Sequence, residues 1–294
     1  MPTTIAEDGT ELHYREDSFT APWEEPQAVI LLHAGAESGL AWYGWMPRLS
    51  SRFRVIRPDM RGFGQSAAMS RFHPWSVAEL ANDVLTVARA CNLQRFHLIA
   101  AEAAGPVALR LAARSQERVL SLTLCGVFVS GAATFGSRHN AWLEHIERQG
   151  VGSWARAQLH ERLGAVDDEA MRAGWAAMLA RTNPASLVGF MKALPEFEAG
   201  EDIERVTCPT LVMTTDGSTL NTLETTRTWQ PRIGQSELMV LAGDGWHVAA
   251  SHAKDCVGSV MEFYKKNEKK DGRSDRDRNE KKEQKKERRQ KERA

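Results

Sequence analysis

Residues 95–106 constrain the fold of this chain more than any other stretch. A short apolar pattern typical of a strand is followed by a cluster of very small residues and then by a helical pattern over residues 107–114. A sharp strand-to-helix turn needs small side chains two positions before and after its tip, because the backbone there is pressed against its neighbours. Ala100 and Ala104 meet that demand, and Glu102 stands at the tip. The sequence therefore predicts a tight turn that presents a carboxylate.

The elements on either side of this turn alternate between strands and helices. Asp8-Gly9 marks a hairpin near the start, and residues 75–91 have helical spacing, with Ser76 placed to cap the helix. Alternation of this kind predicts an α/β fold with a doubly wound, mostly parallel sheet that binds ligands at the carboxyl ends of its strands. Strands are expected over residues 3–6, 11–15, 28–32, 53–58, 95–100, 120–125, 209–213 and 237–241.

One segment interrupts the alternation. Residues 131–200 carry several helical patterns and no convincing strand, which predicts a helical lid inserted into the sheet domain. The core is then formed by residues 1–130 and 201–264, with the last helix over about residues 250–264. Residues 265–294 are almost entirely charged or polar, so we expect a tail that is disordered or a solvated helix.

Charge is distributed unevenly although the chain of 294 residues has no formal net charge. The tail holds 15 of the 38 basic and 8 of the 38 acidic residues, so the body is mildly acidic. This balance argues against a nucleic-acid-binding face on the body. The four cysteines show no C-x-x-C pair, and the sequence contains neither a signal segment nor a long apolar run. We expect a cytoplasmic protein with no membrane insertion.

Taken together, these motifs resemble the α/β-hydrolase superfamily over about residues 3–264. The turn at Glu102 resembles the nucleophile elbow, His33-Ala34-Gly35 resembles the oxyanion segment, and residues 57–66 resemble the D-x-R-G-x-G-x-S loop. His247 follows the last strand, where the family keeps its catalytic histidine. The resemblance is closest in lid and length to small lactonases and C–C hydrolases, including enol-lactone hydrolases. It implies an oxyanion hole made by the backbone N–H groups of Gly35 and Ala103.

The sequence departs from the family in two places. Glu102 stands where the family has Ser, Cys or Asp as the nucleophile. The acid that orients the histidine normally lies a few residues beyond residues 209–213, and that position holds Ser218. Asp216, two residues earlier, is the leading candidate for the acid, and Asp244 is a weaker one.

A glutamate at the elbow suggests three functions. In the leading hypothesis the protein is a hydrolase in which Glu102, paired with His247, is a general base that activates water. The substrate is then a small carbonyl compound with a C–C bond next to a ketone, or an activated ester or lactone. Glu102 is instead a nucleophile if the protein hydrolyses epoxides or haloalkanes, although the lid lacks the tyrosines that epoxide hydrolases use. In the third hypothesis the protein is a hydrolase that has lost its catalytic activity and acts as a small-molecule-binding or regulatory protein.

The remaining candidates carry weaker signals. Four tryptophans are candidates for lining a substrate pocket, although helical spacing makes packing as plausible. Basic residues of the lid are candidates for meeting a carboxylated substrate, although a solvated face is the commoner role. No histidine or cysteine spacing predicts a metal or a cofactor, and the sequence does not define an oligomeric state. The tryptophans are Trp42, Trp142, Trp154 and Trp246, and the basic residues are Arg138, Arg148, Arg156, Arg162 and Lys192.

Overall fold

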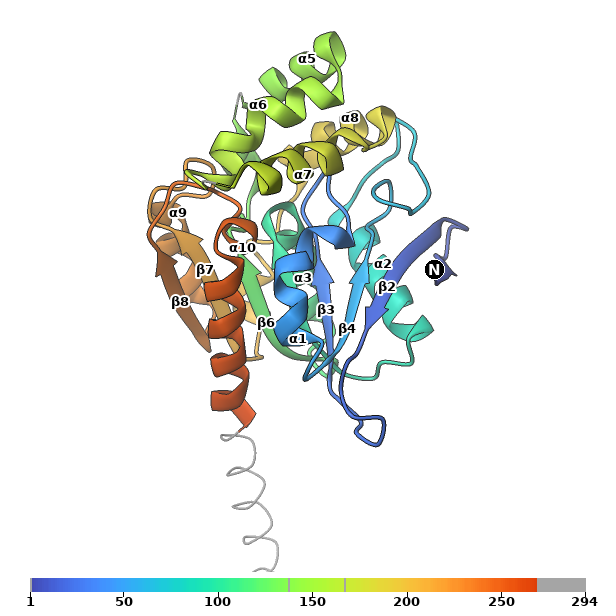
Figure 1. Cartoon of the computed structure of the whole chain (residues 1–294), viewed down its shortest axis with the longest axis vertical. Helices are drawn as coiled ribbons and strands as arrows, with labels where there is room; N and C mark the ends of the chain where they lie inside the picture. Colours follow the sequence, from blue (N-terminus) through green and yellow to red (C-terminus); the bar gives the residue numbers. More distant parts are fainter. Residues whose placement is uncertain (1, 137, 167, 269–294) are drawn as a thin grey trace, which may run out of the picture.

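A computed structural model describes residues 2–136, 138–166 and 168–268. Its centre is an eight-stranded sheet (Figure 1) of order β1-β2-β4-β3-β5-β6-β7-β8. Neighbouring strands from β4 to β8 are parallel, whereas β1 and β2 join antiparallel at one edge. This arrangement confirms the predicted doubly wound, mostly parallel sheet. The strands are β1 (Thr3–Ile5), β2 (Glu11–Asp17), β3 (Ala28–Leu32), β4 (Arg54–Pro58), β5 (Phe96–Ala101), β6 (Val119–Cys125), β7 (Thr210–Thr215) and β8 (Ser236–Leu241).

The sheet is buried on both faces, which explains why its central strands are continuous apolar runs. All five residues of β3 are buried, and they alternate between two apolar clusters. Ile30 and Leu32 pack with α2 (Val77–Ala90) and α3 (Gly105–Arg114) on one face. Val29 and Leu31 pack on the other face with the 3-10 segment η1 and the terminal helix over residues 253–268. That helix extends beyond the predicted end at residue 264, and the rest of the charged tail lies outside the described residues.

In the described part of the chain, five α-helices lie between β6 and β7, within residues 131–200, the segment that the sequence predicts to be a lid and that we call the lid. In Figure 1, α5 to α8 stand above the carboxyl ends of the parallel strands, where ligands bind in such sheets. The lid helices are α4 (Gly131–Phe135), α5 (Arg138–Gln149), α6 (Val151–Leu163), α7 (Glu169–Ala180) and α8 (Pro184–Ala193). The other short elements are η1 (Gly39–Trp45), α1 (Met46–Leu49), η2 (Glu102–Ala104), η3 (Leu194–Glu196), η4 (Ile203–Arg205), α9 (Leu223–Trp229), η5 (Gln230–Arg232) and α10 (Val248–Ser251).

The packing of α3 against the chain after β6 depends on Gly105. A Cβ on Gly105 would lie 2.4 Å from Cβ of Val127. Val127 has little room to move because it is part of the buried core. We expect Gly105→Ala to lower the free energy of unfolding by about 1–3 kcal/mol through this overlap. Gly174→Ala is the matched control, because that helical glycine has no atom within 4 Å of its added Cβ. Urea unfolding measures both, and equal stabilities would contradict the packing argument.

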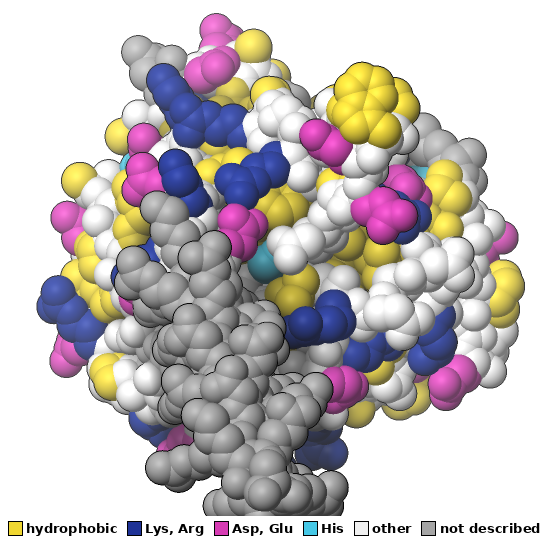
Figure 2. All heavy atoms as spheres, turned by 90° about the horizontal axis from the view of Figure 1, so that it is seen from below, with side chains coloured by type: hydrophobic (Ala, Val, Ile, Leu, Met, Phe, Trp, Pro, Cys, Tyr) yellow, Lys and Arg dark blue, Asp and Glu magenta, His cyan; other side chains and the backbone are white. Residues whose placement is uncertain are grey.

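The surface seen from below carries charges of both signs. Where side chains are coloured in Figure 2, Lys and Arg lie among Asp and Glu rather than in a field of one sign. Within the described ranges, no helix combines the length and the apolar character needed to cross a bilayer.

Candidate active site

Glu102 stands on a sharp turn at the carboxyl edge of the sheet. β5 ends at Ala101, and Glu102 begins η2 with a φ of 45°. A residue other than glycine is strained in this left-handed region, and strain at this position is typical of a nucleophile elbow. The side chain is 8% exposed. The turn therefore holds a carboxylate, almost shielded from solvent, at the carboxyl edge of the sheet.

The loop after β3 forms one wall of the site. His33 bonds through both ring nitrogens, Nδ1 to the carbonyl of Ala34 in the same loop at 2.7 Å and Nε2 to the N–H of Met60 in the loop after β4 at 2.9 Å. Gly35 packs so closely against the lid that an added Cβ would lie 2.7 Å from the ring of Phe190. Ala34 donates its N–H to Oε2 of Glu37 at 3.1 Å. The loop thus turns the side chain of Glu37 inward.

Four buried charged side chains meet at this edge: Glu37, Glu102, Arg162 and His247, which we call the charged quartet. Nη1 of Arg162 donates to Oε1 of Glu37 at 2.6 Å and to the two oxygens of Glu102 at 3.4 and 3.3 Å. Nε2 of His247 lies 3.0 Å from Oε1 of Glu37 and 3.8 Å from Oε1 of Glu102. Each of the four residues is at most 6% exposed. The two carboxylates therefore share two cationic partners.

The lid and the histidine loop are joined by the backbone. The last carbonyl groups of a helix have no partner within the helix, and those of Glu161 and Arg162 in α6 accept the N–H groups of Trp246 and His247 at 3.1 and 2.9 Å. The ring of Trp246 also lies 5.9 Å from the guanidinium carbon of Arg162. Arg162 and His247 are thereby held in one rigid unit.

The surroundings drive the pKa values of the two glutamates in opposite directions. Burial alone would raise the pKa of Glu37, but the adjacent His247 and Arg162 outweigh burial and lower it to about 2. Burial raises the pKa of Glu102, and the more distant Arg162 and His247 offset this only in part. The two carboxylates together outweigh the desolvation of His247 and raise the pKa of its imidazole. The surroundings therefore favour the ionised form of Glu37 and the protonated form of Glu102.

Acid should remove the stabilisation that Glu37 supplies. Its folded pKa of about 2 lies below the ordinary value of 4.5, so the unfolded chain binds more protons between these two values. Stability is therefore lost as the pH falls from 4.5 towards 2, by on the order of 3 kcal/mol. Urea unfolding across this range should show a steeper loss in the wild type than in Glu37→Gln. The exposed Glu117→Gln variant is the control, and parallel slopes for the wild type and Glu37→Gln would contradict an ionised Glu37.

The cavity beside the quartet is small. It measures about 20 Å³ and is bounded by Glu102, Arg162, Asn221, Gly35 and Ala103 together with apolar side chains. This volume holds about one water molecule. Of the tryptophans proposed from sequence, Trp142 and Trp246 line it. Trp154 packs against Trp142 inside the lid, and Trp42 packs in the cluster on the opposite face of the sheet.

The structure does not bring the candidate acids to the histidine. Asp216 is exposed, and its Oδ1 accepts the N–H of Gly243 at 2.9 Å. Asp244 accepts the N–H of Ala165 at 3.1 Å, so it braces the chain that leaves α6. Ser218 is buried, with no hydrogen bond to its hydroxyl within the described chain. Nδ1 of His247 likewise has no hydrogen-bond partner among the described residues.

The carboxylate that the structure places against His247 is Glu37, whereas the sequence predicted Asp216, which follows β7. Glu37 follows the oxyanion segment, and nothing in its local pattern marks it as a partner of a residue 210 positions later. The position of Arg162 in the sequence, by contrast, does indicate a buried role. The buried positions of α6 include Val151, Trp154, Ala155, Leu159 and Leu163, and Arg162 falls on the same helical face. A basic residue on the apolar face of a lid helix indicates a buried anion opposite it.

The quartet also resembles a metal site in its donor types. Ligand atoms of Glu37, Glu102 and His247 lie within 4.8 Å of one another in the described part of the chain. The guanidinium of Arg162 nevertheless contacts both carboxylates, at 2.6 Å and 3.3 Å. A metal ion would have to compete with this built-in cation, so the donor set fits a metal poorly.

Comparison with known proteins places the chain in a family. Residues 27–249 match the family model described as "alpha/beta hydrolase fold". The protein named "Putative carbamate hydrolase RutD" from Caulobacter sp. (strain K31) is 27% identical over 82% of this chain and 92% of its own length. The 2-hydroxy-6-oxo-2,4-heptadienoate hydrolase of Pseudomonas putida is 34% identical over 33% of this chain and 36% of its own.

The solved structures agree at the level of the fold. The enol-lactonase from Burkholderia xenovorans LB400 superposes with a TM-score of 0.81 at 22% identity, covering 90% of this chain and all of that one (100%). The chain therefore belongs to the α/β-hydrolase fold family and is a hydrolase of that superfamily.

Proposed function

We propose that this hydrolase cleaves a small carbonyl compound, either at a C–C bond next to a ketone or at an activated ester or lactone, with Glu102 as general base. The observation that carries the proposal is the placement of Glu102 on the strained elbow, 3.8 Å from Nε2 of His247 and beside a cavity the size of one water. A raised pKa supports this role, because a stronger base takes a proton from water more readily.

The reaction follows from the charges of the quartet. Water adds its oxygen to the carbonyl carbon and gives its proton to Glu102. The resulting oxyanion is held by the N–H groups of Gly35 and Ala103, which both border the cavity. The intermediate collapses, the bond to the leaving group breaks, and the imidazolium of His247 protonates the departing carbanion or alkoxide. Transfer of the proton from Glu102 to His247 then restores the starting state.

Glu37 sets the charge state that this cycle requires. Its ionised carboxylate lies 3.0 Å from His247 and stabilises the imidazolium, which is the form that donates a proton. Arg162 neutralises the second carboxylate in a site where an unpaired buried charge is costly. Both tasks need a fixed anion and a fixed cation, and the hydrogen bonds from Ala34 and the lid hold them in position.

A substrate must enlarge the closed cavity, since about 20 Å³ admits only water. The lid therefore moves, or side chains rotate, when substrate binds. This closed state also favours the third hypothesis, a decayed hydrolase that binds a ligand, because Arg162 already contacts the Glu102 carboxylate at 3.3 Å.

A turnover panel in heavy-oxygen water tests the proposal. The wild type is assayed with β-diketones, activated esters, lactones, epoxides and haloalkanes, and the protein is then examined by mass spectrometry. A general base leaves Glu102 unlabelled while the product acid gains heavy oxygen, whereas a carboxylate nucleophile acquires label in Glu102 itself. An inert wild type, together with esterase activity in Glu102→Ser, would overturn general-base catalysis on this panel and favour the binding protein.

A further inference from the structure

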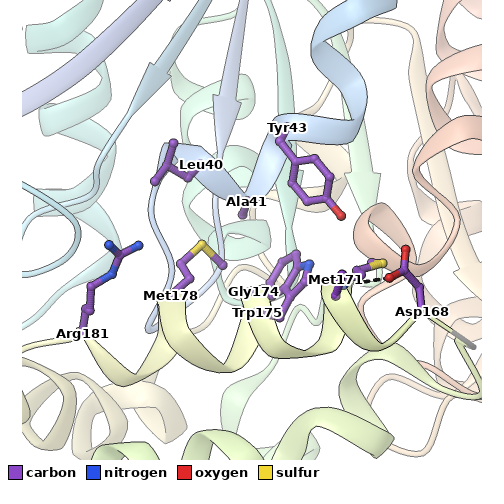
Figure 3. Close-up of a pocket in the computed structure, with 10 residues that line it drawn as sticks. Leu40, Ala41, Tyr43, Asp168, Met171, Gly174, Trp175, Met178 and Arg181 are labelled. Carbon is purple, nitrogen blue, oxygen red and sulfur yellow. Dashed lines mark hydrogen bonds between the residues drawn. The ribbon is translucent and has the colours of Figure 1, made fainter.

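A second, larger hollow lies between the lid and the core. It measures about 460 Å³ and runs between α7 and η1 (Figure 3), and we call it the α7 groove. Trp175 forms part of its wall and meets the ring of His247 edge-on at 5.0 Å. The α7 groove therefore adjoins the charged quartet but is not the cavity that holds Glu102.

The middle of the α7 groove is apolar. Leu40 and Tyr43 of η1 are 40% and 54% exposed, and both line the α7 groove. In Figure 3 the side chains of Met171, Trp175 and Met178 rise from α7 towards them. Between these walls Gly174 leaves open space. A ligand with an apolar body would bury this surface favourably, and the volume lies in the range of small-molecule sites.

The two ends of the α7 groove carry opposite charges. Arg181 stands at one end, and Asp168, whose carboxylate caps α7 through the N–H of Met171, stands at the other. At the Arg181 end the groove meets a polar hollow of about 170 Å³, which shares Leu40, Met178 and Arg181 and adds Arg15. An anion is therefore attracted to the arginine end and repelled from the opposite one.

The two arginines are free to bind a ligand. Nε of Arg15 is shielded from solvent without a hydrogen-bond partner, and within the described residues neither Arg15 nor Arg181 forms an ion pair. The carboxylates that line the same hollow are already engaged. Asp59 accepts from His13 at 2.9 Å and from the N–H of Gly39 at 2.7 Å, and Glu37 belongs to the charged quartet.

We propose that the α7 groove binds an amphipathic carboxylate, with its chain between η1 and α7 and its head group at Arg15 and Arg181. The proposal concerns binding alone and does not depend on the chemistry at Glu102. Guanidinium groups bind carboxylates through charge-assisted, often bidentate hydrogen bonds. The apolar wall favours an apolar chain, and the charged end favours an anion.

Isothermal titration of the full chain with decanoate tests the proposal. Decanol and decyltrimethylammonium serve as neutral and cationic probes of the same length. Gly174→Trp fills the groove where no atom lies within 4 Å of the added Cβ, so it should weaken decanoate binding at least tenfold. Ala173→Trp, on an exposed position of α7 outside the groove lining, is the matched control and should bind as the wild type does. Arg15→Gln and Arg181→Gln should each weaken binding by about threefold to tenfold.

The binding results distinguish a specific site in the α7 groove from nonspecific binding and from a site elsewhere. Selective binding of decanoate that Gly174→Trp and the arginine variants weaken supports the site. Equal binding of all three probes would show nonspecific attachment to apolar surface and would overturn it. Decanoate binding that survives Gly174→Trp would place the ligand elsewhere. If Gly174→Trp unfolds, Arg181→Glu is decisive, because reversing an exposed charge should abolish decanoate binding and leave the thermal unfolding temperature unchanged.

Discussion

Glu102→Gln is expected to lower kcat by about 10²- to 10⁴-fold, the usual contribution of a positioned general base. Glutamine keeps the shape of the side chain and its hydrogen-bond acceptor for Arg162, but it cannot take a proton from water. The measurement is steady-state hydrolysis of whichever panel substrate the wild type accepts. A variant that retains full kcat would show that the Glu102 carboxylate takes no part in the chemistry.

The stability of Glu102→Gln shows whether a loss of activity comes from the missing carboxylate or from a damaged fold. The pKa of Glu102 is raised in the folded protein, so the fold binds more protons there than the unfolded chain does. Stability attributable to Glu102 therefore falls as the pH rises from its ordinary value of 4.5 through the folded value. Glutamine removes this loss, so Glu102→Gln should be at least as stable as the wild type above neutral pH. Lost activity with retained stability would identify a functional carboxylate rather than a structural one.

Glu102→Ser is the second comparison. Serine restores the family nucleophile at a position with the φ of an elbow, 45°, but Glu37 lies 3.0 Å from Nε2 of His247 and raises the pKa of the imidazole, which favours the imidazolium. A protonated histidine cannot accept the hydroxyl proton. We therefore expect little esterase activity in Glu102→Ser unless Glu37→Gln is added. High activity in the single variant would show that His247 is neutral in the absence of Glu102.

The fold was predictable because its signals are local. The small residues around Glu102 predict the turn, and apolar runs such as β3 predict strands buried on both faces. The order in which these signals follow one another then limits the topology to a doubly wound sheet. Glu102 and His247 could be paired because the resemblance to the α/β-hydrolases assigns one to the elbow and the other to the histidine position after the last strand.

The rest of the site depends on contacts between segments that local patterns do not connect. Glu37 reaches His247 because the loop after β3 turns inward through its bond to Ala34. Arg162 reaches both glutamates because the C-terminal end of α6 is fixed to the histidine loop. The prediction of Asp216 as the orienting acid rested on its position along the chain. In the structure Asp216 instead stabilises its own turn through Gly243, and the nearest carboxylate to the histidine comes from the opposite end of the domain.

Arg162→Met is expected to lower the free energy of unfolding by about 3–5 kcal/mol, the usual cost of removing one partner from a buried ion pair. Methionine keeps the aliphatic length of the side chain but leaves Glu37 and Glu102 with only His247 as a cationic partner. Arg156→Met is the matched control, because Arg156 is exposed on the same helix, and its effect should stay within about 0.5 kcal/mol. Urea unfolding at pH 8 measures both changes.

Two further comparisons show whether charge or packing causes the loss in Arg162→Met. Combining it with Glu102→Gln removes one of the stranded carboxylates, so the double variant should be more stable than Arg162→Met alone. Lowering the pH from 8 to 5 should also shrink the loss, because without the guanidinium the raised pKa of Glu102 rises further and the carboxyl binds a proton. A loss that is independent of pH and unchanged by Glu102→Gln would mean that Arg162 stabilises the lid through its contacts with Trp246 rather than through the charged quartet.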